Sequence, residues 1–95
     1  MKGYWVCIYE KIHSEDKLKE YAVKSKLAVE KFNGKFIVRG GKSRTNDGMN
    51  TPRIVVVEFA SYNAAIECYD SAEYQEAHSI LKNHAIRHHQ VVEGN

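Results

Sequence analysis

The sequence predicts an α+β domain in which an antiparallel sheet carries helices on one face only. Four segments rich in β-branched and aromatic residues alternate with helical patterns, in the order β-α-β-β-α-β. The second helical pattern is broken in two at Asp70-Ser71. This order is the ferredoxin-like split pattern. It leaves the second face of the sheet uncovered in one chain.

Size, charge and cysteine usage limit the possible functions. Residues 1–95 fit a single domain with a thin core. The 14 Lys and Arg against 12 Asp and Glu give a net charge of +2, which is too weak and mixed for a nucleic-acid footprint. Neither a membrane span nor a secretory signal is visible, so we expect a cytoplasmic protein without a membrane or nucleic-acid partner. Cys7 and Cys68 stand in apolar contexts and are expected to be buried thiols.

The first half of the chain reads as strand, helix, strand. Residues 4–10 have the composition of a strand, and Ser14 is a candidate N-cap for the helix that follows. Apolar and small residues recur there at helical spacing: Leu18, Tyr21, Ala22, Ser25, Ala28, Val29 and Phe32. Asn33-Gly34 can end this helix in a left-handed conformation. Residues 35–39 then form the second strand.

The second half completes the pattern. Residues 42–52 lie in a long polar loop of the kind that is either functional or mobile, and this loop could act as a lid. Residues 53–60 form the strongest β segment, followed by a short helix over 62–69. Ser71 caps a further helix, and a last strand spans about 87–93.

Two of the predicted strands are apolar on both faces. In residues 4–10 and 53–60, both alternating sets of side chains are mostly apolar. One helix layer covers only one face of a sheet, and soluble proteins seldom expose a large apolar patch. We therefore expect a homodimer that packs through the open sheet face.

Four segments resemble a known family. They are Asn33–Gly41, Arg53–Ala65, Tyr69–Ala77 and Val91–Gly94, and their combined order is similar to domain of unknown function 1330. The resemblance covers nearly the whole chain and implies a dimeric α+β barrel. The wider superfamily includes monooxygenases of the antibiotic-synthesis type, haem-degrading enzymes and isomerase- or dehydratase-like proteins. If the chain is an enzyme, this analogy implies cofactor-independent monooxygenase, isomerase or lyase chemistry.

Arg39 and Glu58 are the candidate catalytic residues. Each is a charge near the end of an otherwise apolar strand, and the two strands are expected to pair as a hairpin. A charge on a covered strand needs a partner. One interpretation is a structural ion pair at the sheet edge or dimer seam. In the other, Arg39 holds an anionic group and Glu58 acts as a general base.

Tyr69, Ser71 and Tyr74 surround the helix break and are the candidate ligand-binding residues. The new helix N-terminus could bind an anion. The alternative is that the two tyrosines are core residues with satisfied hydroxyl groups. Trp5 and Tyr9 could stack on a flat ligand, but aromatic residues in a first strand are more typical of a core or an interface.

The histidines do not form a metal-binding pattern. His88 and His89 are adjacent, so on a strand their side chains point to opposite faces. We expect one of them to face the helices or the dimer seam and to titrate near neutral pH. No metal site and no bound cofactor is therefore predicted.

Two hypotheses about function remain open. The first is a homodimer that binds or transforms a small organic molecule, with an anionic one as a candidate, in a pocket between sheet and helices. The second is a non-catalytic dimeric module that senses a ligand or contacts another protein. An open pocket with convergent polar groups would favour the first, and a closed apolar one the second.

Overall fold

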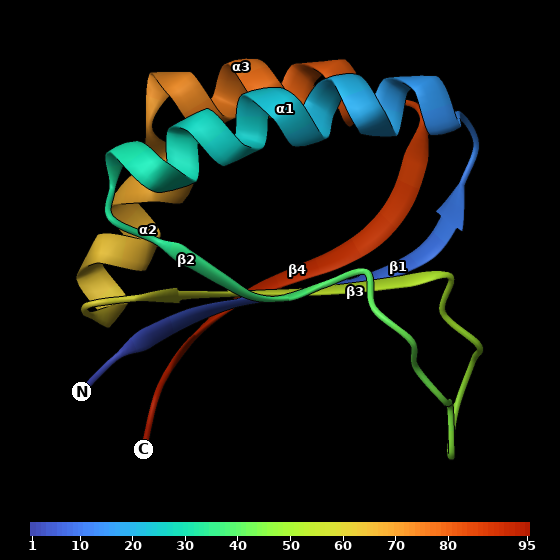
Figure 1. The fold of residues 1–95 in the computed structure, drawn as a ribbon, viewed down its shortest axis with the longest axis horizontal. Helices are drawn as coiled ribbons and strands as arrows, with labels where there is room; N and C mark the ends of the chain where they lie inside the picture. The colour runs from blue at the N-terminus through green and yellow to red at the C-terminus, as the bar shows by residue number, and fades with distance from the viewer.

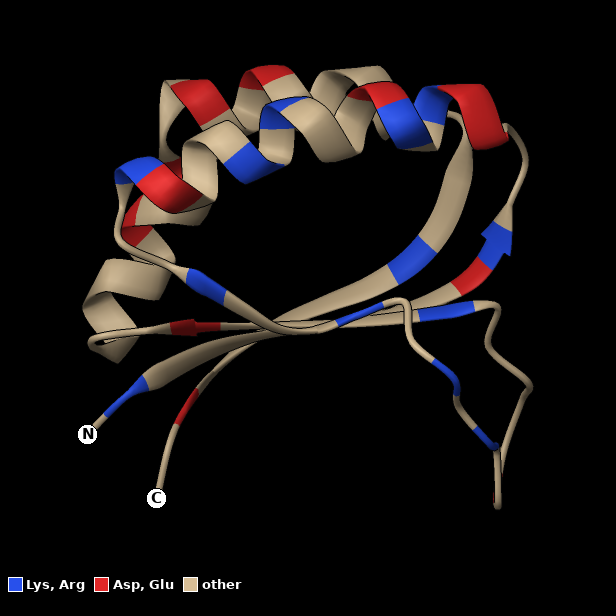
Figure 2. Ribbon diagram, viewed as in Figure 1, with Lys and Arg blue, Asp and Glu red and all other residues tan.

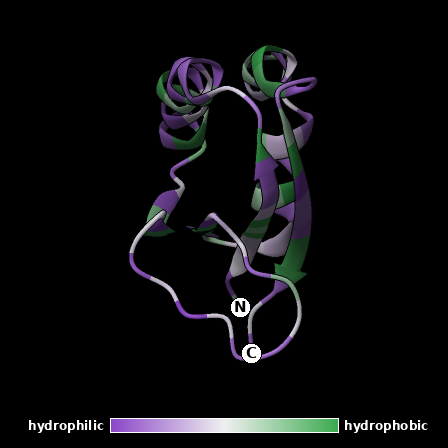
Figure 3. Cartoon of the chain, turned by 90° about the vertical axis from the view of Figure 1, so that its right-hand side faces the viewer, coloured by the Kyte–Doolittle hydropathy of each residue, from purple (hydrophilic) through white to green (hydrophobic).

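Four antiparallel strands form one sheet in the order β2-β3-β1-β4, and three helices lie over one of its faces (Figure 1). The computed structural model describes residues 1–95 and has the predicted α+β, ferredoxin-like architecture. Its elements are β1 (Gly3–Ile12), α1 (Glu15–Lys31), β2 (Lys35–Arg39), β3 (Arg53–Phe59), α2 (Tyr62–Asp70), α3 (Ala72–Leu81) and β4 (Ala85–Glu93). The two long helices α1 and α3 lie side by side above the sheet (Figure 3).

Serine side chains fix where the helices begin. Ser14, Ser61 and Ser71 each accept a hydrogen bond from a backbone N–H of the first turn, at 3.0–3.2 Å. The Ser14 and Ser71 caps were expected from the sequence. Asn33 ends α1 with a φ of 58°, the left-handed conformation that asparagine tolerates.

The core lies between the sheet and the helices. The strands turn alternate residues towards α1, α2 and α3, including Trp5, Val57 and Phe59, each at most 3% exposed. Tyr74 and Ala65 meet them from the helix side with no exposed surface. The strands and the helix layer are thus held together by a well-packed core.

The other face of the sheet is uncovered. Large apolar side chains with 40–47% exposure stand on the even-numbered positions of three strands: Ile8, Val38, Ile86 and Val92. The expectation of an open apolar sheet face is confirmed. No helix of the chain has both the length and the hydrophobicity needed to span a bilayer.

The loop between β2 and β3 does not lie between the sheet and the helices. It descends on the side of the sheet away from α1, at the end opposite the chain termini (Figure 1). It is anchored at its end by Thr51, whose hydroxyl group bonds the backbone oxygens of Tyr9 and Arg53. The expectation that residues 42–52 form a lid over a pocket between sheet and helices is therefore wrong.

Candidate functional site

Cross-strand pairing sets polar and aromatic side chains in two rows below α1. In the first row, Tyr9 of β1 pairs with Arg53 of β3 on one side and with Arg87 of β4 on the other. The next row runs across all four strands as Arg39, Val55, Cys7 and His89. Residues in one row of a sheet point to the same face. The helix-covered face therefore carries three arginines close together.

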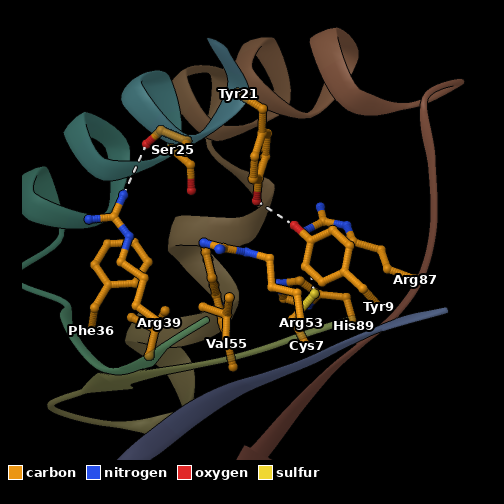
Figure 4. Close-up of a pocket in the computed structure, with 13 residues that line it drawn as sticks. Cys7, Tyr9, Tyr21, Ser25, Phe36, Arg39, Arg53, Val55, Arg87 and His89 are labelled. Atoms are coloured by element: carbon orange, nitrogen blue, oxygen red, sulfur yellow. Dashed lines mark hydrogen bonds between the residues drawn. The ribbon is translucent and has the colours of Figure 1, made fainter. Parts of the chain in front are cut away.

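These rows form the floor of a cavity that α1 covers. Tyr21 and Ser25 of α1 lie above it, and Phe36 of β2 adds an apolar wall (Figure 4). Ala22 of α1 and the apolar side chains of Val57 and Trp5 also line it. The free space inside is about 20 Å³, room for about one water molecule. A larger ligand must therefore displace side chains, and those of Arg39, which is exposed, and Arg53, which is half-buried, have the fewest hydrogen bonds to lose.

The charge of the cavity is wholly positive. Arg39, Arg53 and Arg87 are three of the four arginines in the sequence, and no Asp or Glu lines the cavity. None of the ion pairs in the chain involves an arginine. Figure 2 shows basic segments of β2, β3 and β4 meeting in the half of the sheet below the N-terminal part of α1. Three guanidinium groups thus share one cavity without a protein counter-ion.

Arg87 is held by neutral oxygens. Its Nη2 donates to the Tyr74 hydroxyl at 2.6 Å, and its Nη1 donates to the Tyr21 hydroxyl at 3.0 Å and, at 3.4 Å, to Tyr9 Oη and Cys7 Sγ. Burial by itself disfavours the Arg87 cation, but the surrounding tyrosine and cysteine groups outweigh it and raise the pKa of Arg87. The guanidinium therefore stays charged at neutral pH.

Arg53 and Arg39 are held more loosely. The Arg53 guanidinium carbon lies 6.0 Å from the Tyr9 ring centroid, and its buried Nε has no hydrogen-bond partner. The Arg39 guanidinium stacks over the Phe36 ring at 4.3 Å, and its only hydrogen bond is a long one to the backbone oxygen of Ala22, at 3.4 Å. Both retain donors that a ligand could use.

His89 adds an unpaired polar atom to the same cavity. Its ring lies 4.9 Å from that of Trp5 and 4.8 Å from that of Tyr69, and its buried Nε2 has no partner. Burial, helped by the positive charge of Arg87, lowers the pKa of His89 to about 3. His89 faces the helices as expected of one of the pair, but the expectation that this residue titrates near neutral pH is wrong. His88 points to the open face and pairs with Glu10.

Glu58 and Arg39 do not meet. Their strands pair as the expected hairpin, but Glu58 lies on the open face of the sheet, where Lys2 Nζ is 3.0 Å from its carboxylate. Arg39 lies on the helix-covered face and lines the cavity. The expectations that the two pair with each other or share a pocket are therefore wrong, and Glu58 has no place in this cavity as a general base.

The residues at the helix break surround the cavity without lining it. Tyr74 is fully buried and bonds Arg87 from behind. Tyr69 packs against the His89 ring. Ser71 caps α3 and donates to the Cys68 backbone oxygen at 2.6 Å, so its hydroxyl group is already used within the protein. A direct role of these three in ligand binding stays a prediction.

Sequence reasoning missed Arg53, Arg87 and the α1 tyrosine Tyr21 as site residues. Arg53 and Arg87 stand at the start of strands, where charges are common, so neither stood out. The alternation of side chains along the last strand was the available signal, because it places Arg87 and His89 on the same face as Val91. Only the strand register shows that Arg53 and Arg87 flank the same tyrosine.

Comparisons with known proteins find one matching family model and several solved structures with the same fold. The model of Domain of unknown function (DUF1330) matches residues 2–95. No curated protein matches. A protein of unknown function from Rhodopseudomonas palustris is similar in structure, with a TM-score of 0.74, 15% identity and coverage of 99% of this chain and 82% of that one.

Two further structures show the same fold. SnoaB, a cofactor-independent oxygenase from Streptomyces nogalater, has a TM-score of 0.70 and 10% identity, with 99% of this chain and 93% of that one covered. A dimeric ferredoxin-like protein of unknown function from Thermobifida fusca has a TM-score of 0.61 and 12% identity, with 99% and 92% covered. At such identities these likenesses carry the fold and not the activity.

Proposed function

The chain belongs to the DUF1330 family, and on that premise we propose that it binds a small organic anion in the cavity between α1 and the sheet. One observation carries the proposal: Arg39, Arg53 and Arg87 line a single cavity that contains no carboxylate. A partly buried charge without a counter-ion is costly, so proteins usually pair it. A bound anion would supply the missing partner.

The apolar side of the cavity suggests what else the ligand carries. Phe36, Val57 and Trp5 lie next to the arginines, and Phe36 already stacks under Arg39. Flat apolar groups pack well against such aromatic side chains. An aromatic carboxylate combines both requirements, with the carboxylate at the guanidinium groups and the ring on the apolar side.

Benzoate and benzamide test this proposal as a matched pair, because they differ in charge and hardly in shape. We expect benzoate to raise the melting temperature and to change the fluorescence of Trp5, the only tryptophan. At about 100 times its dissociation constant, benzoate would add about 2.7 kcal/mol to the free energy of unfolding. Benzamide should do neither.

Two variants locate the effect. Arg53→Gln should remove most of the benzoate response, whereas Arg44→Gln should retain it, because Arg44 is exposed in the β2–β3 loop and bonds Asn46. Equal responses to benzoate and benzamide would contradict an anion site. If both variants lose the benzoate response equally, benzoate binds outside this cavity.

Binding is better supported than catalysis. No carboxylate reaches the cavity, and a His89 with a pKa of about 3 is a weak base. SnoaB shares the fold and is a cofactor-independent oxygenase, which makes oxygenase chemistry the candidate reaction if the bound molecule is transformed. Oxygen consumption in the presence of a bound ligand, measured with an oxygen electrode, distinguishes an enzyme from a ligand-sensing module.

We also propose that two copies pack through their open sheet faces. The exposed apolar side chains on that face support this, as do similar structures described as dimeric from Thermobifida fusca and Bacteroides fragilis. Sedimentation should give twice the 10.9 kDa of one chain. Ile8→Asp on the open face should give monomers, whereas Val23→Asp on the outer side of α1 should not. A wild-type monomer would refute the dimer.

The cytoplasmic location of the protein stays a prediction.

A further inference from the structure

The hydroxyl groups around Arg87 have a fixed hydrogen-bond direction. Tyr74 Oη is fully buried and accepts from Arg87 Nη2. Its own proton needs an acceptor, and the oxygen of Tyr21, 2.9 Å away, is the one within hydrogen-bond distance. Tyr74 therefore donates to Tyr21. The reverse direction would leave the Tyr74 proton buried and unpaired, which costs about 1–3 kcal/mol.

This direction leaves the Tyr21 proton available. The Tyr21 oxygen accepts from Tyr74 and from Arg87 Nη1, which uses both of its lone pairs. Its proton must then point elsewhere, and Tyr21 lines the cavity. Tyr9 Oη, which also accepts from Arg87 Nη1, stands beside it with an unspent proton of its own. Burial raises the pKa of Tyr9 to about 12, so this hydroxyl keeps its proton at neutral pH.

Arg87 is thereby prevented from acting as a carboxylate clamp. Both terminal nitrogens of its guanidinium already donate to tyrosine oxygens, so its paired N–H edge is not offered to a ligand. The groups that face the cavity at this end are hydroxyl donors, polarised by the cation behind them. Such an end suits a single ligand oxygen. Arg39 and Arg53, by contrast, have few partners and suit a carboxylate.

We propose that the cavity takes a planar acid with a hydroxyl or enol oxygen at the end opposite its carboxylate, and that Tyr21 donates the hydrogen bond to that oxygen. The inference rests on the proposed anion site. Arg53 and Arg87 flank Tyr9 on neighbouring strands, so their backbones lie about 10 Å apart. A para-substituted aromatic acid has a comparable length. Tyr74 is a positioning residue, because it acts only through Tyr21 and Arg87.

Calorimetric titration with 4-hydroxybenzoate and 4-methylbenzoate tests the inference, because the two acids differ mainly in the hydroxyl group. The wild type should bind 4-hydroxybenzoate about tenfold more tightly. Tyr21→Phe should reduce this ratio to about one while leaving the affinity for 4-methylbenzoate nearly unchanged. Tyr74→Phe should reduce it in part. Tyr62→Phe, an exposed tyrosine outside the cavity, should leave it unchanged.

The outcomes separate the two proposals. If both acids bind the wild type equally, or if the tenfold ratio survives in Tyr21→Phe, the inference is overturned and the anion site stands. If neither acid binds, the anion site itself is refuted, and the inference with it. The comparison of two acids on the wild type needs no variant, so it decides even if Tyr21→Phe fails to fold.

Discussion

The helix-covered face of the sheet is built in two different ways at its two ends. At one end Trp5, Val57 and Phe59 pack against Ala65 and the rest of the helix layer with almost no exposed surface. At the other end, called the arginine end, Arg39, Arg53 and Arg87 line the cavity beneath α1. The same strands β1 and β3 run through both ends, so the contrast comes from side chains and not from backbone.

The two ends contribute differently to the free energy of folding. The apolar end removes hydrocarbon from water, at about 25 cal/mol per Å². The arginine end places cations in a partly buried cavity and leaves Arg53 Nε and His89 Nε2 without partners. Such groups lower stability, and proteins keep them where function needs them. The first end thus holds the fold together, whereas the unpaired groups of the second end are those that the proposed anion would stabilise.

The largest effect should come from the apolar end. Trp5→Ala removes ring contacts to Phe59 and Tyr74, at centroid distances of 5.1 and 4.8 Å, and a hydrogen bond from Nε1 to the Ala65 backbone oxygen. We expect the free energy of unfolding to fall by about 3–5 kcal/mol. Urea denaturation followed by circular dichroism measures it. A loss below about 1 kcal/mol would mean that this end is not the structural core.

Acid should weaken the protein through His89. The pKa of His89 is about 3 in the folded state and close to 6.5 when unfolded. Between these values the unfolded chain binds a proton that the folded chain does not, so stability is complete above about pH 6.5 and falls as the pH drops towards 3. We expect a loss of about 2 kcal/mol from pH 7 to pH 5.

Matched variants isolate this histidine, since carboxylates also titrate in acid. His89→Gln should remove most of the loss between pH 7 and pH 5 in urea denaturation. His84→Gln, outside the cavity, should leave it in place. A wild-type and a His89→Gln protein with the same pH dependence would show that His89 is solvated in the folded state.

Arg53→Met should change stability little or raise it. The variant removes a charge without a counter-ion and a buried Nε without a partner, and its thioether side chain fills similar space. We expect a change between zero and about 1 kcal/mol in the stabilising direction, together with loss of benzoate binding. Thermal unfolding with and without benzoate measures both. A destabilisation above about 2 kcal/mol would assign Arg53 to the structure.

The smallest expected effect is a difference in reactivity between the two cysteines. Both thiols are buried, but Cys7 lines the cavity and Cys68 does not. Burial raises the pKa of both thiols, for Cys68 to about 12. Cys7 should react several-fold faster with a thiol reagent under native conditions, because the arginine end opens more readily. Benzoate should slow Cys7 alone. The Cys7→Ala and Cys68→Ala variants assign the two rates, and equal rates would argue against the contrast.

Much of the fold could be predicted from the sequence because its signals are local. Serine caps, helical spacing and the left-handed Asn33 each depend on a few neighbouring residues. The uncovered sheet face could be predicted as well. Strand 53–60 has apolar residues on both faces, and only one helix layer was available to cover them.

The site could not be predicted, because it depends on register. Glu58 and Arg39 were grouped as charges on neighbouring strands, but which alternating set of β3 faces the helices is not readable when both sets are apolar. In addition, a bulge in β2 between Phe36 and Val38 shifts the register, so Phe36 and Arg39, three residues apart, line the same cavity. An unbroken strand would point them to opposite faces.

Arginine side-chain signals in an NMR titration with benzoate test the anion site most directly, because the chain has one arginine outside the cavity and three within it. The Nε–Hε resonances of Arg39 and Arg53, whose guanidinium groups have few partners, should shift and saturate together, whereas that of Arg44 should stay in place. A shift of Arg44 as large as those of Arg39 and Arg53, or no saturating shift of Arg39 and Arg53, would contradict an anion site at the arginine end.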